Sequence, residues 1–87
     1  MIIQRNGEWL TAEVDQELVM ISVDQGTYIG LNAVGARVWE LLETPREQET
    51  LYEVLRAEFN VSQQACQADV DEFLAEMERA GAIVITE

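Results

Sequence analysis

The spacing of apolar and polar residues changes its period at Asn32, where a predicted strand passes directly into a predicted helix. Apolar residues alternate over 27–31 and then recur at helical spacing over 33–42. Asparagine is a favoured residue type at a helix N-cap. Two earlier stretches, 9–14 and 18–23, also have strand character, and polar turns separate the three. The first half of the chain therefore predicts three short antiparallel strands followed by a helix.

The second half predicts two further amphipathic helices and a closing strand. The first of these helices has a strong start signal, because Thr44 is a suitable N-cap, Pro45 suits the first helical position and Glu47 completes a capping box. The second helix starts at Ser62 and carries an apolar stripe at helical spacing. A short apolar run over 82–86 predicts a final strand. The stripe consists of Cys66, Val70, Phe73 and Met77.

The fold class expected from this order is α+β and winged-helix-like: a three-stranded antiparallel sheet followed by three helices, with a short C-terminal strand that returns to the sheet. The length of 87 residues is enough for one small domain, and no internal repeat or linker divides it. We therefore expect a single domain over residues 1–87. Residues 1–8 are expected to form a loose N-terminal arm.

The charge balance argues against nucleic acids and membranes as partners. Seventeen acidic residues oppose five arginines, there is no lysine, and the net charge is −12. Nucleic-acid binding depends on basic side chains that neutralise phosphates. The helix over 62–80 would be the recognition helix of a winged-helix protein, and Arg79 is its only basic residue. An acidic winged-helix domain with a DNA-binding or regulatory role is therefore kept only as a remote alternative, and no apolar run reaches the ~18 residues of a membrane span.

The residue types of the common catalytic and metal sites are missing. Without histidine, the chain lacks the commonest general base and metal ligand. Its one cysteine, Cys66, has no histidine partner for nucleophilic catalysis and cannot build a zinc site or an internal disulfide. Neither serine stands in the Asp-Ser-Leu context of an acyl carrier, and no glycine pattern suits a phosphate. We therefore expect no enzymatic activity, no metal and no cofactor, and, because no signal peptide is visible, a cytoplasmic protein.

The class of function that remains is the binding of a protein or a peptide. In a meander whose strand order follows the chain, the strand over 27–31 lies at an edge, where unpaired backbone groups can accept an added strand. Gly30 lets another backbone approach closely. The helix over 62–80 could wall a groove beside this edge. A monomer is expected, although a free edge strand can also pair with a second copy.

The junction between strand and helix has a distinctive sequence. Residues 26–42 read Gly-Thr-Tyr-Ile-Gly-Leu-Asn-Ala-Val-Gly-Ala-Arg-Val-Trp-Glu-Leu-Leu. This stretch resembles the signature of PqqD-like proteins, a Gly-x-Tyr-x-Gly-Leu-Asn strand followed by a Gly-Ala-Arg helix. Residues 69–74, Asp-Val-Asp-Glu-Phe-Leu, and residues 80–83, Ala-Gly-Ala-Ile, extend the likeness toward the end of the chain. Ile29 departs from the pattern, since many relatives have a second aromatic residue there.

This resemblance implies a recognition element for ribosomally synthesised and post-translationally modified peptides. Such domains are not catalytic. They bind the leader region of a precursor peptide as a strand added to 27–31, in a cleft against the helix over 62–80. Stand-alone members of this size are typical of lasso-peptide biosynthesis, beside a leader peptidase of the cysteine-protease type and a macrolactam synthetase. The alternative is a PqqD-type peptide chaperone for a radical enzyme in the synthesis of pyrroloquinoline quinone or another modified peptide.

The candidate peptide-binding residues fall into two groups. The edge strand is expected to bind mainly through its backbone, and the helix through apolar pockets and one carboxylate. Helical spacing leaves open which flank of the stripe meets the peptide, so Leu74 faces either the core or the groove, whereas Trp39 and Leu42 are assigned to the core. The candidates are Thr27, Tyr28, Ile29, Gly30 and Leu31 on the strand, Val70, Phe73 and Met77 for the pockets, and Asp69 for a hydrogen-bond donor or basic residue of the leader.

Overall fold

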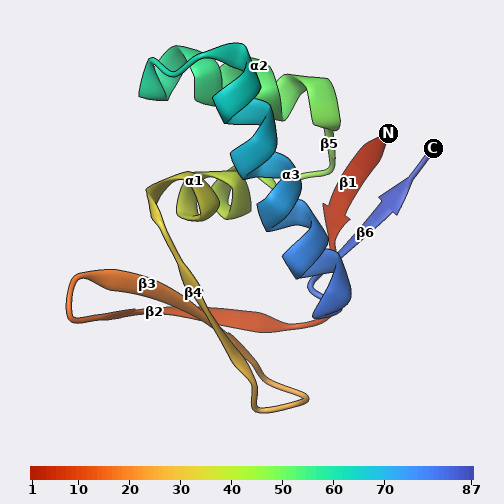
Figure 1. The fold of residues 1–87 in the computed structure, drawn as a ribbon. Helices are drawn as coiled ribbons and strands as arrows, with labels where there is room; N and C mark the ends of the chain where they lie inside the picture. The colour runs from red at the N-terminus through yellow and green to blue at the C-terminus, as the bar shows by residue number, and fades with distance from the viewer.

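The computed structural model describes residues 1–87 as two small antiparallel sheets and three helices (Figure 1). The larger sheet is a meander with the strand order β2-β3-β4, and the second sheet has the order β5-β1-β6. The helices lie on one side of the meander, and the second sheet stands beside them. The expected α+β order of three antiparallel strands, three helices and a C-terminal strand is confirmed. The elements are β1 (Ile2–Arg5), β2 (Trp9–Val14), β3 (Glu17–Ser22), β4 (Tyr28–Leu31), α1 (Ala33–Leu41), β5 (Arg46–Glu47), α2 (Gln48–Phe59), α3 (Gln63–Arg79) and β6 (Ile83–Thr86).

Two tight turns shape the meander. Asp15 and Gln16 connect β2 to β3 with positive φ angles of 52° and 70°, which give a two-residue hairpin the twist of its strands. Gly26, in the turn between β3 and β4, has a φ angle of 72°, which glycine adopts without a steric penalty. Both turns lie where the sequence predicted them.

The ends of the helices confirm two of the predicted N-caps and correct the third. The side chain of Asn32 accepts a hydrogen bond from the Gly35 amide at 2.8 Å, and Ser62 caps α3 in the same way. The predicted capping box of α2 is wrong, because α2 begins at Gln48 and its N-cap residue makes no side-chain bond. The amide of Gln48 instead donates to the carbonyl oxygen of Met1 at 3.0 Å, so a distant backbone group replaces the local cap.

The N-terminal segment is part of the fold, which corrects the prediction of a loose arm over residues 1–8. Strand β1 lies between β5 and β6, and Ile3 is fully buried. The predicted C-terminal strand forms as β6, but it pairs with β1 and does not return to the meander. The pairing partners of β1 are about 40 and 80 residues away along the chain, so local periodicity carried no sign of them.

One hydrophobic core joins the helices to both sheets. Each helix contributes at least one large, fully buried side chain, as do β1, β3 and β6. None of the helices has both the length and the apolar character needed to cross a membrane. The largest fully buried side chains are Ile3, Met20, Val38, Leu42, Leu51, Leu55, Val70, Met77 and Ile83.

Candidate functional site

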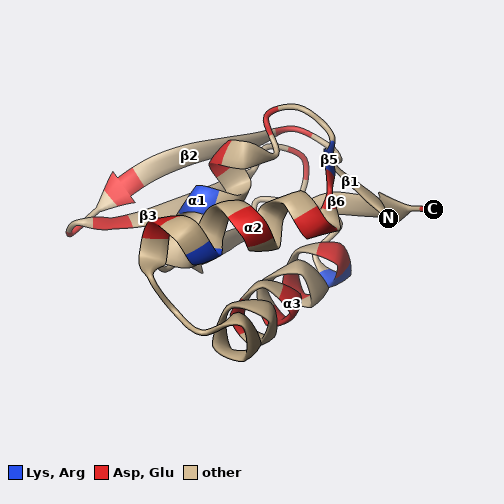
Figure 2. Ribbon diagram, turned by 90° about the horizontal axis from the view of Figure 1, so that it is seen from above, with Lys and Arg blue, Asp and Glu red and all other residues tan.

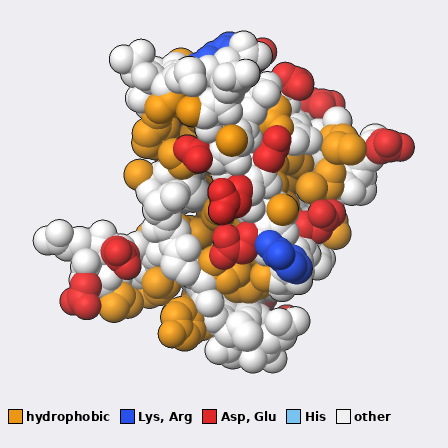
Figure 3. Space-filling model, viewed as in Figure 1, with side chains coloured by type: hydrophobic (Ala, Val, Ile, Leu, Met, Phe, Trp, Pro, Cys, Tyr) orange, Lys and Arg blue, Asp and Glu red, His pale blue; other side chains and the backbone are white.

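A groove runs between the free edge of β4 and the flank of α3. Its cavity volume is about 140 Å³, and it is open to solvent along the strand. Phe73 is its one apolar side chain, so the groove is mainly polar. In the space-filling view, acidic atoms gather over α3 beside this edge (Figure 3). The lining residues are Gly30, Asn32, Asp69, Glu72, Phe73 and Glu76.

The backbone of β4 directs its unpaired groups into this groove. The Ser22 amide donates to the carbonyl oxygen of Thr27 at 2.8 Å, which makes these two residues a hydrogen-bonded pair. Such pairs alternate along an antiparallel ladder, so Ile29 and Leu31 also bond to β3. Tyr28 and Gly30 therefore present their N–H and C=O groups at the open edge. Strand addition would use these two residues.

The side chains of β4 alternate between solvent and core. Tyr28 is 75% exposed, whereas Ile29 is half-buried and Leu31 is buried. A Cβ atom built on Gly30 would meet no other atom within 4 Å, so the space above this residue is free for a second backbone. Thr27 is exposed and lies just before the strand. The five predicted strand residues thus lie together, but only two of them offer backbone groups to a partner.

The groove side of α3 carries three exposed carboxylates at helical spacing, from Asp69, Glu72 and Glu76, which we call the groove carboxylates. None of them forms a salt bridge within the molecule. Figure 2 shows the acidic residues that follow one another along α3. Because a carboxylate accepts hydrogen bonds and favours a nearby cation, this wall suits a peptide with N–H donors or basic side chains. The prediction named Asp69 and missed the two glutamates.

Phe73 is held in the groove by a close fit against α1. A Cβ atom placed on Gly35 would lie 2.9 Å from Cε1 and 3.0 Å from Cδ1 of the Phe73 ring. Such distances are shorter than ordinary van der Waals contact, so only glycine lets the ring lie this close to α1. Gly35 is therefore a positioning residue that the sequence analysis did not assign. Gly35 belongs to the Gly-Ala-Arg part of the motif, but the motif did not show which side chain packs against this glycine.

Val70 and Met77 do not line the groove, which corrects their predicted role as pocket walls. Both are fully buried in the core, below the surface on which Asp69 and Phe73 lie. Leu74 is also a core residue with 2% exposure, which answers the question that helical spacing left open. The groove is thus formed by the acidic flank of α3 and by Phe73 at the border of the apolar stripe.

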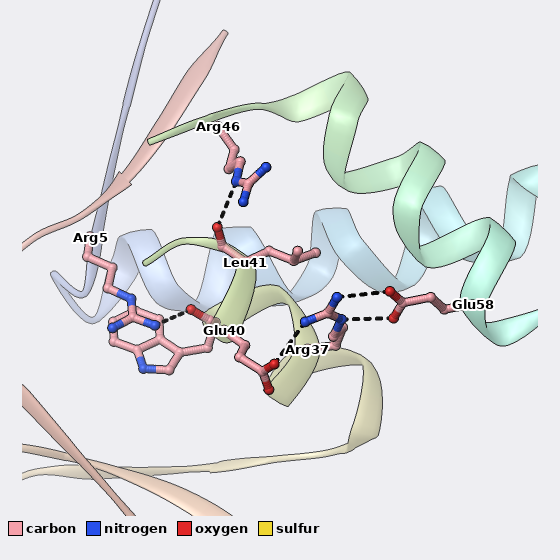
Figure 4. A network of polar contacts seen from close by, with 7 residues as sticks. Arg5, Arg37, Glu40, Leu41, Arg46 and Glu58 are labelled. Atoms are coloured by element: carbon pink, nitrogen blue, oxygen red, sulfur yellow. Dashed lines mark hydrogen bonds and ion pairs between the residues drawn. The ribbon is translucent and has the colours of Figure 1, made fainter. Parts of the chain in front are cut away.

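An arginine on α1 connects the helix behind the groove to α2. Arg37 donates from Nε and Nη2 to the two carboxylate oxygens of Glu58, at 2.8 and 2.9 Å, and from Nη1 to Glu40 at 2.8 Å (Figure 4). This bidentate hydrogen bonding lowers the pKa of Glu58 and raises that of Arg37. Arg46 donates to the carbonyl oxygen of Leu41 at 3.0 Å, at the end of the same helix. These contacts hold α1, and with it Gly35, in place.

The fold and the groove define an α+β, winged-helix-like domain with an open strand edge beside an acidic helix. The model of the family described as coenzyme PQQ synthesis protein D (PqqD) matches residues 17–83, which is well over half of the chain. The chain belongs to the PqqD family. No match to the chain is found among curated proteins.

Two solved structures have a similar fold over nearly their whole length. The first, described as TbiB1 in complex with the TbiA(beta) leader peptide, is 28% identical with a TM-score of 0.79, and the match covers 97% of this chain and 98% of that chain. The second, described as lasso peptide synthetase B1 complexed with the leader peptide, is 20% identical with a TM-score of 0.75 and covers 95% and 98%. At that lower identity the second structure shows a likeness of fold alone.

Proposed function

We propose that this chain is a non-catalytic domain that binds the leader region of a ribosomally synthesised precursor peptide. The leader adds as a strand to β4 and lies in the groove beside α3. The observation that carries this proposal is the open edge at Tyr28 and Gly30, directed into a groove that no part of the chain fills. The PqqD family and the leader complex of the relative that is 28% identical support it.

The groove suggests the chemistry of the leader segment. An incoming strand pairs with the backbone of Tyr28 and Gly30, and its alternate side chains face α3. There, a basic or hydrogen-bond-donating side chain meets the groove carboxylates, and an apolar side chain lies against Phe73. Val70 and Met77 act from below, by holding α3 at the distance from β4 that leaves room for the strand.

The proposed role in the cell is delivery of the precursor to processing enzymes. In lasso-peptide biosynthesis these are a leader peptidase of the cysteine-protease type and a macrolactam synthetase. The Tyr-x-Gly-Leu-Asn and Gly-Ala-Arg-x-Trp-Glu-Leu-Leu wording of residues 28–42 favours this setting. The family description favours the alternative, a peptide chaperone for a radical enzyme in quinone synthesis. We propose that the chain acts in the cytoplasm as a single, monomeric domain in either setting.

The test is a titration of the chain with a synthetic leader peptide from a precursor gene beside its own gene, followed by calorimetry and amide NMR. The two edge residues and α3 should show the largest shifts. Gly30→Pro removes an outward N–H and fills the free space, so affinity should fall by about tenfold or more. Ile29 is unsuitable for this test, because its backbone groups bond to β3.

The matched control is Thr11→Pro, which makes the same change on the other edge strand, β2. It should leave leader affinity unchanged, and circular dichroism should show both variants folded. Equal leader affinity in Gly30→Pro and the wild type would refute strand addition at β4.

A further inference from the structure

A second hollow lies at the opposite edge of the meander, between β2 and α1. Its cavity volume is about 320 Å³, compared with about 140 Å³ for the groove beside α3. This size is at the lower end of small-molecule pockets, at roughly 300–1,000 Å³, and leaves room for one or two side chains. We call it the aromatic pocket. Its lining residues are Arg5, Trp9, Thr11, Leu18, Ala36, Trp39 and Glu40.

The free edge of β2 is in register with this pocket. The Val23 amide donates to the carbonyl oxygen of Glu8 at 3.1 Å, so this pair begins the alternation of hydrogen-bonded pairs between β2 and β3. It follows that Trp9, Thr11 and Glu13 present their backbone N–H and C=O groups away from β3. Trp9 and Thr11 also line the pocket with their side chains. A strand added here would therefore place alternate side chains toward α1 and into the pocket.

The β2 edge carries little of the usual protection against pairing. Exposed edge strands are commonly short or carry charged side chains, above all lysine, or proline or a bulge. Strand β2 has six residues, none of them lysine or proline, and its only charge is Glu13. Two apolar side chains on it face solvent, with Leu10 59% and Val14 53% exposed. These features are typical of an edge that another chain covers.

The pocket contains a cation that forms no salt bridge. The Arg5 guanidinium lies over the Trp39 ring, 4.1 Å from its centroid, and donates to the Trp39 carbonyl oxygen. Its Nε is buried and has no acceptor. No carboxylate forms a salt bridge with Arg5, and Glu43 acts on it only through its charge. Glu40, the one acid that lines the pocket, is bound by Arg37. In a chain with net charge −12, an unpaired arginine at a pocket favours an acidic ligand.

We propose that the β2 edge and the aromatic pocket form a second docking site, which takes an extended segment of a partner protein. The segment carries a large apolar side chain for the pocket and, two positions away on the same face, an acidic side chain for Arg5. A second copy of this chain is a poor occupant, because each copy has a net charge of −12. The site lies at the other edge from the proposed leader site, so a strand at each edge can be bound at the same time.

The chain carries a reporter for this site alone. Its two tryptophans, Trp9 and Trp39, both line the aromatic pocket, and neither lines the groove beside α3. Tryptophan emission should therefore respond to a ligand at β2 and change little with a tryptophan-free peptide at β4.

The test is a selection of random peptides displayed on phage against the full-length chain, in parallel with its Gly30→Pro variant. Enriched peptides are then made without tryptophan and titrated by tryptophan emission and amide NMR. We expect an acidic and a large apolar residue two positions apart, and shifts centred on residues 9–14. Affinity should be equal for wild type and Gly30→Pro, about tenfold lower for Thr11→Pro, and several-fold lower for Arg5→Gln.

Three outcomes would overturn the proposal. One is that no peptide survives selection against Gly30→Pro. Another is that the enriched peptides shift β4 and α3 and leave β2 and the tryptophan emission unchanged. The third is that light scattering shows a dimer of the chain that Thr11→Pro abolishes, which would make a second copy the occupant. If Thr11→Pro does not fold, the NMR map on the wild type decides. Leader binding at β4 is measured in a separate titration, so its failure would not change the result of this test.

Discussion

In the proposed complex, the fit of Phe73 against Gly35 would make leader affinity sensitive to a single methyl group that the leader does not touch. In Gly35→Ala the new Cβ must increase its distance to the Phe73 ring from 2.9 Å to at least 3.4 Å, the start of ordinary contact. The same atom would lie 3.3 Å from Oδ1 of Asn32, which caps α1. Because Asn32 is held by its hydrogen bond to the Gly35 amide, the ring is the part that moves.

The expected change in stability is small, because two effects oppose each other. Alanine is favoured over glycine inside a helix by up to about 1 kcal/mol. Extra volume in a packed site costs about 1–3 kcal/mol. The free energy of unfolding should therefore fall by roughly 0–2 kcal/mol, and the variant should stay folded.

Leader binding should fall because the ring leaves the position that defines the apolar part of the groove. Phe73 is half-buried, so in the proposed complex the leader would cover part of one face of its ring. Losing about half of the burial of an aromatic side chain costs about 1 kcal/mol, which corresponds to a roughly fivefold higher Kd. Calorimetric titration with the leader peptide measures this change, and thermal unfolding checks the fold.

A double-mutant cycle with Phe73→Leu separates displacement of the ring from a general loss of stability. Leucine is the smaller side chain and leaves room for the methyl group on residue 35. Phe73→Leu should weaken binding in the wild type and have little or no effect in Gly35→Ala, with a coupling free energy of about 0.5–1 kcal/mol. If Gly35→Ala binds the leader as the wild type does, or if the two changes are additive, the reasoning about Phe73 is wrong.

Three further predictions concern the groove and the core. Neutralising the three groove carboxylates with Asn and Gln should weaken leader binding and flatten its dependence on salt, while the exposed Glu53→Gln on α2 should not. Ile3→Ala should lower the free energy of unfolding by about 2–5 kcal/mol in urea titrations, whereas its exposed neighbour Gln4→Ala should leave it nearly unchanged. Burial and the hydrogen bond to Asp71 raise the pKa of Tyr52 from 10.0 to about 12. The unfolded chain releases this proton at a lower pH than the folded chain does. The contribution of Tyr52 to stability should therefore be complete below pH 10 and be lost as pH rises toward 12. Tyr52→Phe should remove that decline, which alkaline denaturation can measure.

The features of this fold that depend on residues close together in the sequence could be predicted. The pairing of residues far apart in the sequence could not. Asn32 and Ser62 cap their helices with their own side chains, a contact over three residues that the local pattern contains. The start of α2 depends instead on backbone pairing of 46–47 with β1, far away along the chain. The turn chemistry at 44–47 favoured an earlier start, and tertiary pairing overrode it.

The candidate site divides in the same way. The alternation of apolar residues predicted the strand over 28–31, and the expected strand order placed it at an edge of the sheet. The position of the site was therefore predictable. The apolar stripe of α3 predicted which side of this helix is buried. It showed neither which residues of the stripe lie deepest nor which neighbouring residues line the groove. Val70 and Met77 were therefore assigned to the surface and lie in the core, while Glu72 and Glu76 were left out.

The pairing of β1 with β6 has a consequence for the order in which the molecule assembles. The meander closes through short turns, whereas Ile3 can pair with Ile85 only after residue 85 has been synthesised. Contacts between such distant residues require a large loop to close and slow the folding of a small protein. None of the residues that line the groove belongs to the β5-β1-β6 sheet. During synthesis on the ribosome, its edge strand and its acidic helix can therefore meet before β1 pairs with β6.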